Sequence, residues 1–188
     1  MVWNDRRITE WAQAGGVTPF DAACVNPASL DLRLGNKIAV PHRSWLLKPD
    51  KSINRKTPSS ELWQEPFEFD VYKLKPGYAA LCHSMEYIKM PSDGAGTLFS
   101  KSSTGRILLE HLHAGYFDPD FQGEATFEFF NDGPWTVELR PGDRFVQLRI
   151  DQMIEVPAKS YLVTGRYNGQ TGPTAARIRS EERRVGKE

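Results

Sequence analysis

Apolar and polar residues alternate along residues 124–130. Ala125, Phe127 and Phe129 fall on one side of a two-residue repeat, which is typical of a β-strand with one face in a core. We therefore expect these three side chains to be buried. Glu128 lies on the opposite face and is expected to point away from them.

Two further alternating segments follow this strand, separated by turn sequences. Asn-Asp-Gly-Pro at 131–134 and Arg-Pro-Gly-Asp at 140–143 are strong turn signals, and apolar residues alternate again at 137–139 and 146–150. Short strands joined by tight turns predict a mainly all-β fold of the sandwich, jelly-roll or barrel kind.

Helical signals are confined to the start of the chain. Ile8 and Trp11 have helical spacing, and Gly15-Gly16 supplies a stop. The 13 prolines and 15 glycines, spread along the whole chain, leave little room for long helices. Residues 41–66 are rich in Pro, Ser and Lys and predict a long surface excursion.

The composition excludes several classes of protein. The 188 residues include 24 Lys+Arg and 24 Asp+Glu, so no surplus of cationic side chains is available to neutralise the phosphates of a nucleic acid. No apolar run reaches the ~18 residues of a membrane span, and the N-terminus lacks the apolar core of a secretory signal, so we expect a cytoplasmic protein. Cys24 and Cys82 lie far apart and are expected to be small buried hydrophobic residues.

Residues 179–188 differ in kind from the sequence that precedes them. They are almost all charged, with one apolar residue, and they resemble one reading frame of a sequencing-adapter oligonucleotide. We expect a single domain over residues 1–178 and a non-native tail over 179–188. An ordinary charged terminus is the alternative.

Residues 100–128 hold the densest cluster of reactive side chains. Ser102 and Ser103 can each donate a hydrogen bond to a phosphate oxygen, Gly105 allows close approach of the backbone, and Arg106 offers two donors in a fork. The same composition also suits a plain loop, so these residues alone leave an anion site and an ordinary loop as equal alternatives.

Two carboxylates strengthen the case for chemistry. Asp118 lies in a predicted turn, and Glu128 follows on a strand whose other face is apolar. A carboxylate beside an apolar wall has its charged form disfavoured, which makes Glu128 the candidate general base. The alternatives are a solvated Glu on an outer strand face and a turn Asp that bonds its own backbone.

His111 and His113 lie on one face of a predicted strand and could suggest a metal. The zinc-deaminase signature, H-x-E with P-C-x-x-C, is absent from the sequence, and so is any other zinc-ligand spacing. We therefore expect no zinc site and non-metal roles for both histidines.

A series of motifs runs in one order through the chain. Its members are Asn26–Gly35, Lys75–Gly77, Ser102–Arg106, Ala114–Pro119, Phe121-x-Gly123, Thr126–Glu128, Asn131, Arg140–Gly142, Gln147-Leu148 and Tyr167–Thr174. Together they resemble the motifs of dCTP deaminases, which belong to the trimeric dUTPase superfamily. The last motif resembles that family's nucleotide-covering C-terminal arm.

The resemblance implies a distorted β jelly roll, or dUTPase-like barrel, with a short N-terminal helix. It also implies a homotrimer with active sites between subunits, deoxycytidine triphosphate as substrate, and Mg²⁺ carried on the substrate phosphates. Glu128 would move a proton from water to the departing amine, and Arg106 and Asp118 are the other implied catalytic residues. The implied substrate-binding residues are Lys101, Ser102, Ser103, Arg106, Ala114, Tyr116, Asp118, Arg166, Tyr167 and Gln170.

Deamination of dCTP to dUTP and ammonia is the first function that the resemblance implies. Asp118-x-Asp120, however, resembles the dUTPase version of the motif, in which the residue matching Asp118 activates water toward the α-phosphate. A bifunctional enzyme that forms dUMP and pyrophosphate, or a dUTPase, is therefore the alternative, and a non-catalytic nucleotide-binding module is a third. His113 and Arg166 depart from the family pattern, which usually has Thr and Lys at these positions.

Overall fold

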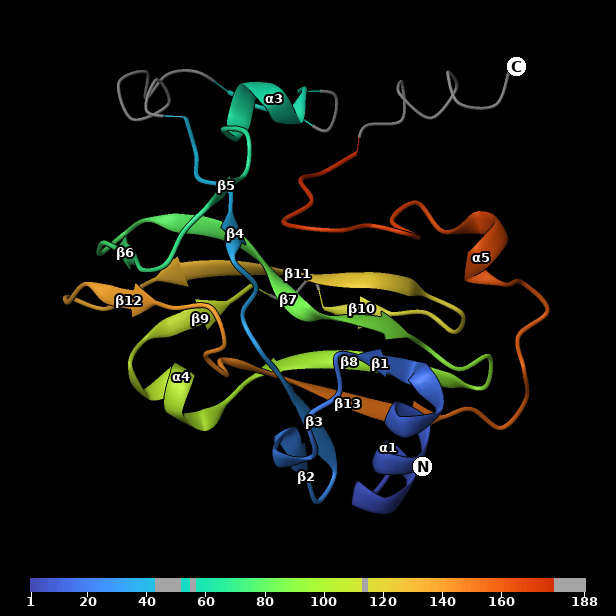
Figure 1. The fold of residues 1–188 in the computed structure, drawn as a ribbon. Coiled ribbons are helices and arrows are strands. Elements are labelled where there is room, and N and C mark those ends of the chain that lie inside the picture. The colour runs from blue at the N-terminus through green and yellow to red at the C-terminus, as the bar shows by residue number, and fades with distance from the viewer. Residues whose placement is uncertain (43–51, 55–56, 113–114, 178–188) are drawn as a thin grey trace.

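Two β-sheets packed against each other form the centre of the computed structural model, which describes residues 1–42, 52–54, 57–112 and 115–177. The first sheet has four strands in the order β1-β7-β11-β9, and the second has five in the order β10-β8-β13-β3-β2. Figure 1 shows β7 and β11 lying above β8 and β13. The strands of these sheets are β1 (Val17–Thr18), β2 (Val25–Asn26), β3 (Ser29–Leu32), β7 (Ala79–Lys89), β8 (Gly94–Ser100), β9 (Leu109–His111), β10 (Tyr116–Phe117), β11 (Gln122–Asn131) and β13 (Val146–Gln152).

Strand β11 is an inner strand of the first sheet and carries Glu128. Burial alternates along its whole length, and Ala125, Phe127 and Phe129 are at most 1% exposed. Strand β7 pairs with it antiparallel and places Leu81 opposite Glu128. The prediction of a strand with a buried apolar face and Glu128 on the other face is confirmed.

The second sheet supplies the other side of the core. Val146, Leu148 and Ile150 of β13 are fully buried, as their alternation predicts. Strand β13 pairs antiparallel with both β8 and β3, so that Leu148 lies between Leu98 and Leu30. Side chains of both sheets join one hydrophobic cluster, and the mainly β fold expected from the sequence is confirmed.

Helices in the described residues are short. Helix α1 (Asp5–Trp11) is capped by Asn4, whose Oδ1 accepts a hydrogen bond from Arg7 N at 3.1 Å. A π-helical turn (Ala12–Gly16) follows, and Gly15 ends it with a φ of 91°. The other helical segments are a 3-10 turn (Ala22–Cys24), α3 (Ser59–Leu62), α4 (Ser102–Arg106) and α5 (Tyr161–Thr164). None of the helices in the described ranges is long and apolar enough to cross a membrane.

Two small strand pairs flank the sheets: β6 (Tyr72–Leu74) with β12 (Val137–Leu139), and β4 (Lys37–Ile38) with β5 (Phe67–Glu68). A bridge between Pro41 and Trp63 closes the described part of the expected excursion. The excursion therefore returns to the body of the protein, and it brings Trp63 beside the first sheet.

Both cysteines are buried and unbonded to each other. Cys24 is 3% exposed and Cys82 is fully buried in the middle of β7. Burial raises the pKa of both thiols. The expectation that they are small core residues is confirmed.

Candidate active site

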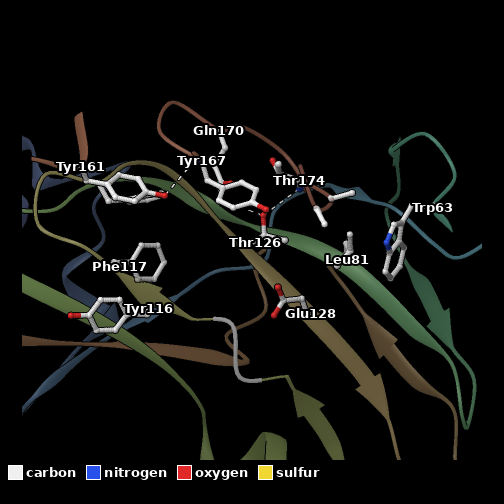
Figure 2. Close-up of a pocket in the computed structure, with 13 residues that line it drawn as sticks. Trp63, Leu81, Tyr116, Phe117, Thr126, Glu128, Tyr161, Tyr167, Gln170 and Thr174 are labelled. Carbon is white, nitrogen blue, oxygen red and sulfur yellow. Dashed lines mark hydrogen bonds between the residues drawn. The ribbon is translucent and has the colours of Figure 1, made fainter. Parts of the chain in front are cut away.

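A cavity of about 350 Å³ lies above the outer face of β11. Figure 2 shows the carboxylate of Glu128 directed into it. Its volume is within the range of small-molecule sites, and Glu128 is the only carboxylate among the described residues that line it. These residues are Trp63, Leu81, Tyr116, Phe117, Phe121, Thr126, Glu128, Tyr161, Tyr167, Gln170, Thr174, Ala175 and Ala176.

The floor of the cavity is the part of β11 that carries Thr126 and Glu128, and Glu124 lies further along the strand, outside the cavity. A β-bulge between Glu124 and Thr126 shifts the register with β7. The Ala125 N–H at this bulge donates to the buried Ser84 Oγ at 2.8 Å, so a backbone group displaced from the strand ladder keeps a partner. The hydroxyl thereby helps to fix which side chains of β11 face the cavity.

The segment 167–177, which we call the arm, forms the roof. Gln170 joins β11 through an isolated parallel bridge, and Thr174 N donates to Thr126 Oγ1 at 3.2 Å. Glu128 lies two residues beyond Thr126 on the same face and points into the space under the arm (Figure 2). The arm thus covers the strand that carries the candidate base.

Aromatic rings form one wall of the cavity. Phe121 packs edge-on against Phe117 with ring centroids 4.8 Å apart and contacts Tyr161 at 5.8 Å. The Tyr161 hydroxyl accepts a hydrogen bond from Tyr167 N at 3.3 Å, which ties α5 to the beginning of the arm. Tyr116 is 65% exposed at the edge of the wall.

Asp120 connects this wall to α5 through its side-chain hydrogen bonds. It adopts a φ of 67°, a conformation that Gly adopts freely and Asp tolerates. Its carboxylate accepts from Ser92 Oγ and from Ser160 Oγ, each at 2.6 Å. Ser160 caps α5 by accepting from Leu162 N.

The cavity lining includes residues that are absent from the predicted site residues, among them Trp63, Leu81, Thr126 and Tyr161. The two-residue period that places Glu128 on the outer face also places Thr126 there, so the sequence does contain a signal for Thr126. The other three come from distant parts of the chain, and no local pattern marks them.

The predicted phosphate-binding segment 101–106 is anchored by its first and fourth residues. Lys101 Nζ donates to Asp31 Oδ2, and the Asp31 side chain is 3% exposed and also accepts from Asn26 Nδ2 at 2.8 Å. Thr104 is buried, and its hydroxyl donates to Phe145 O at 2.8 Å. Lys101 therefore neutralises a buried carboxylate in addition to any role with substrate.

The remaining polar residues of this segment face outward. Ser102, Ser103 and Arg106 are exposed on α4 and do not line the Glu128 cavity. Figure 1 shows α4 and α5 at opposite ends of the molecule. The structure therefore brings Glu128, Tyr116, Tyr167 and Gln170 together in one cavity and leaves the α4 residues elsewhere.

Asp118 and Arg166 lie near the cavity but do not line it. Asp118 is exposed, and its carbonyl accepts from Phe121 N at 3.2 Å, which confirms the predicted turn. Arg166 is exposed and directly precedes Tyr167. His113, Ala114 and the tail 179–188 lie outside the described residues.

The described residues contain no group of three or more His, Cys, Asp or Glu side chains placed to hold a metal ion. His111 packs edge-on against Phe127 and Phe129, with ring centroids 5.9 and 6.1 Å away. Mg²⁺ fits this donor set only as an ion that keeps phosphate and water ligands, which is its usual mode with nucleotides.

Comparison with known proteins places the chain in a family. The dCTP deaminase-like family matches residues 2–153. A Mycolicibacterium vanbaalenii protein named "dCTP deaminase, dUMP-forming" is 37% identical over 94% of this chain and 95% of its own length. Proteins of the same name from Rhodococcus opacus and Corynebacterium glutamicum are 35% and 36% identical, each over 94% of this chain and 96% of the relative.

A solved structure supports the fold. The dCTP deaminase of Agrobacterium tumefaciens superimposes with a TM-score of 0.62 at 22% identity, over 79% of this chain. The match spans 47% of that longer chain, so this likeness concerns the fold alone. The family match and the three relatives confirm the resemblance seen in the motifs: the chain belongs to the dCTP deaminase-like family.

Proposed function

We propose that this protein deaminates dCTP and hydrolyses the triphosphate in one active site, giving dUMP, pyrophosphate and ammonia. The observation that carries the proposal is the Glu128 carboxylate facing a cavity that the arm and an aromatic wall enclose. Relatives that share about a third of the sequence are named for the dUMP-forming reaction. They favour this alternative over the release of dUTP, which the motifs implied first.

In the first reaction, Glu128 takes a proton from water, and the oxygen of that water adds to C4 of the cytosine ring. Glu128 then returns the proton to the amine, the C4–N bond breaks and ammonia leaves, while the remaining proton of the added hydroxyl moves to ring N3 to give a uracil ring. A general base and acid of this kind contributes about 10²–10⁴-fold to the rate. Its place on a paired strand holds the carboxylate still, which favours efficient proton transfer.

In the second reaction, Asp118 activates a water for attack on the α-phosphate. The bond from the α-phosphorus to the bridging oxygen breaks, and pyrophosphate departs. Mg²⁺ carried on the triphosphate would neutralise the charge that develops on the phosphate oxygens. Ser102, Ser103 and Arg106 supply hydrogen-bond donors and positive charge to the same oxygens.

The position of α4 supports a site shared between copies of the chain. Arg106 lies on α4 and does not line the Glu128 cavity, so we infer that a second copy of the chain presents its α4 to the triphosphate. A homotrimer with sites at its interfaces meets this need, because a symmetric ring repeats the same contact at each interface.

Product analysis tests the proposal. The full chain is incubated with dCTP or dUTP and Mg²⁺, and ammonia, dUTP, dUMP and pyrophosphate are resolved. We expect dCTP to yield ammonia, dUMP and pyrophosphate with little free dUTP. Accumulation of dUTP from dCTP would restrict the enzyme to deamination, whereas dUMP from dUTP alone would make it a dUTPase. Binding without any product would identify a non-catalytic module.

A further inference from the structure

A buried histidine and a carboxylate lie beneath the arm, next to the Glu128 cavity but outside it. His83 of β7 places Nδ1 2.7 Å from Oε2 of Glu124 on β11, and the two side chains are 8% and 20% exposed. We propose that His83 and Glu124 form a positioning pair that holds the arm closed over the cavity. The inference rests on the proposed function, in which the arm covers the nucleotide.

Hydrogen bonding fixes the ring of His83 in one form. Lys37 N donates to His83 Nε2 at 3.2 Å, so this nitrogen is an acceptor and the ring proton resides on Nδ1. Nδ1 faces Glu124 as the close ion-pair contact described above. Gly35 makes room for the ring, because a Cβ at this position would lie 2.3 Å from His83 Cε1 and Nε2.

The same carboxylate oxygen holds the arm. Gly172 N donates to Glu124 Oε2 at 2.6 Å, so the oxygen that contacts His83 Nδ1 also accepts a hydrogen bond from the arm. Gly172 has a φ of 68°, a conformation that favours glycine. Thr174–Ala176, which line the cavity roof, begin two residues later.

This bond differs in kind from the other hydrogen bonds described between the arm and β11. Glu124 N donates to Gln170 O at 2.9 Å, and Gly169 N donates to Gln122 O at 2.6 Å, both between neutral backbone groups. A hydrogen bond to a carboxylate is about twice as strong as one between neutral groups. Glu124 is therefore placed to decide how firmly the arm closes, and His83 holds the carboxylate in position.

The pair acts through the arm and does not touch the reacting atoms. His83 and Glu124 line a separate pocket of about 320 Å³ with Asn36, Lys37 and part of the arm, and neither lines the Glu128 cavity. We therefore expect their loss to weaken substrate binding more than it slows the chemical steps.

Hydrogen exchange followed by mass spectrometry tests the inference without nucleotide. In Glu124→Ala, deuterium uptake over residues 167–177 should become about tenfold faster, because the Gly172 amide loses a charged acceptor. Uptake over β13 should not change. Glu124→Gln keeps an oxygen that can accept from Gly172 but removes the charge, so it should restore part of the protection. Glu155→Ala, which removes an exposed carboxylate beyond β13, is the control and should match the wild type.

Kinetics provide the second readout. Glu124→Ala should raise KM for dCTP about tenfold while kcat changes less than about threefold. His83→Leu, an independent variant should Glu124→Ala fold poorly, should shift both readouts in the same direction by a smaller factor.

Unchanged uptake over the arm in both variants would overturn the inference, as would equal acceleration throughout the protein, which would assign the pair a general role in stability. A wild-type protein that fails to deaminate dCTP would refute the proposed function and leave the exchange result to decide the arm separately.

Discussion

The Glu128 cavity and the α4 segment are built in opposite ways, although the family resemblance assigns both to one active site. The cavity has a strand for a floor, aromatic rings for a wall and the arm for a roof. The α4 segment is anchored from below by Lys101 and Thr104, while its phosphate-binding candidates are exposed. An enclosed region suits a reaction on the pyrimidine ring of a nucleotide. An open, cationic region suits binding of the phosphates when the nucleotide is bound in the cavity of another copy of the chain.

Replacing the carboxylate in the enclosed region should have the largest effect. Glu128→Gln preserves the shape of the side chain but cannot accept and return the proton, so ammonia release from dCTP should fall about 10³-fold. Binding of dCTP, measured by calorimetry, should be retained. Glu68→Gln, on the exposed strand β5, is the matched control. Unchanged turnover in Glu128→Gln would remove this residue from the role of base.

Mixing two inactive variants would test whether the regions come from different copies. Arg106→Ala should lose activity, because the triphosphate loses a bidentate cation. If each site combines Glu128 of one copy with Arg106 of another, co-assembly of Arg106→Ala and Glu128→Gln chains in equal amounts should restore roughly a quarter of wild-type activity.

Mixing that restores no activity would show that the site is built within one chain. A site built within one chain would gain nothing from mixing, since every chain carries one lesion. Each variant refolded alone is the control for residual activity.

Asp118→Asn should separate the two proposed reactions. Loss of the second base should slow pyrophosphate release from dCTP about 10²-fold, while ammonia release changes less than tenfold, so dUTP should accumulate. Chromatography of the nucleotides provides the measurement. Equal loss of both products would show that Asp118 serves binding or deamination as well.

Lys101→Met should have the smallest of these effects, and it should act mainly on the stability of the fold. It leaves the Asp31 carboxylate buried with Asn26 as its close partner, so we expect a loss of about 2–3 kcal/mol in the free energy of unfolding, measured in urea. Arg144 Nη1, 3.8 Å from Asp31, limits the loss. A variant that stayed fully stable but bound dCTP weakly would assign Lys101 to substrate alone.

Local patterns predicted the strands and turns well. The alternation at 124–130, the turn at Asp118 and the N-terminal helix with its glycine stop all depend on neighbouring residues, and the structure confirms them. The outward direction of Glu128 follows from the same two-residue period.

Contacts between distant residues could not be read from such patterns. Trp63 and Tyr161 reach the cavity through long-range contacts such as the pairing of Pro41 with Trp63 and the link from Asp120 to Ser160. Lys101 meets Asp31, 70 residues away in the sequence. These contacts depend on strand register and on the path of long connections, which no local repeat encodes.

The burial of both cysteines determines how readily the protein reacts with oxidants and alkylating agents. The thiolate is the form that attacks oxidants and alkylating agents, and burial disfavours it at both Cys24 and Cys82. The folded protein should therefore resist such reagents. Because Cys82 of β7 is fully buried between the two sheets, its modification requires the core to open, so the rate of thiol labelling measures how often the two sheets come apart.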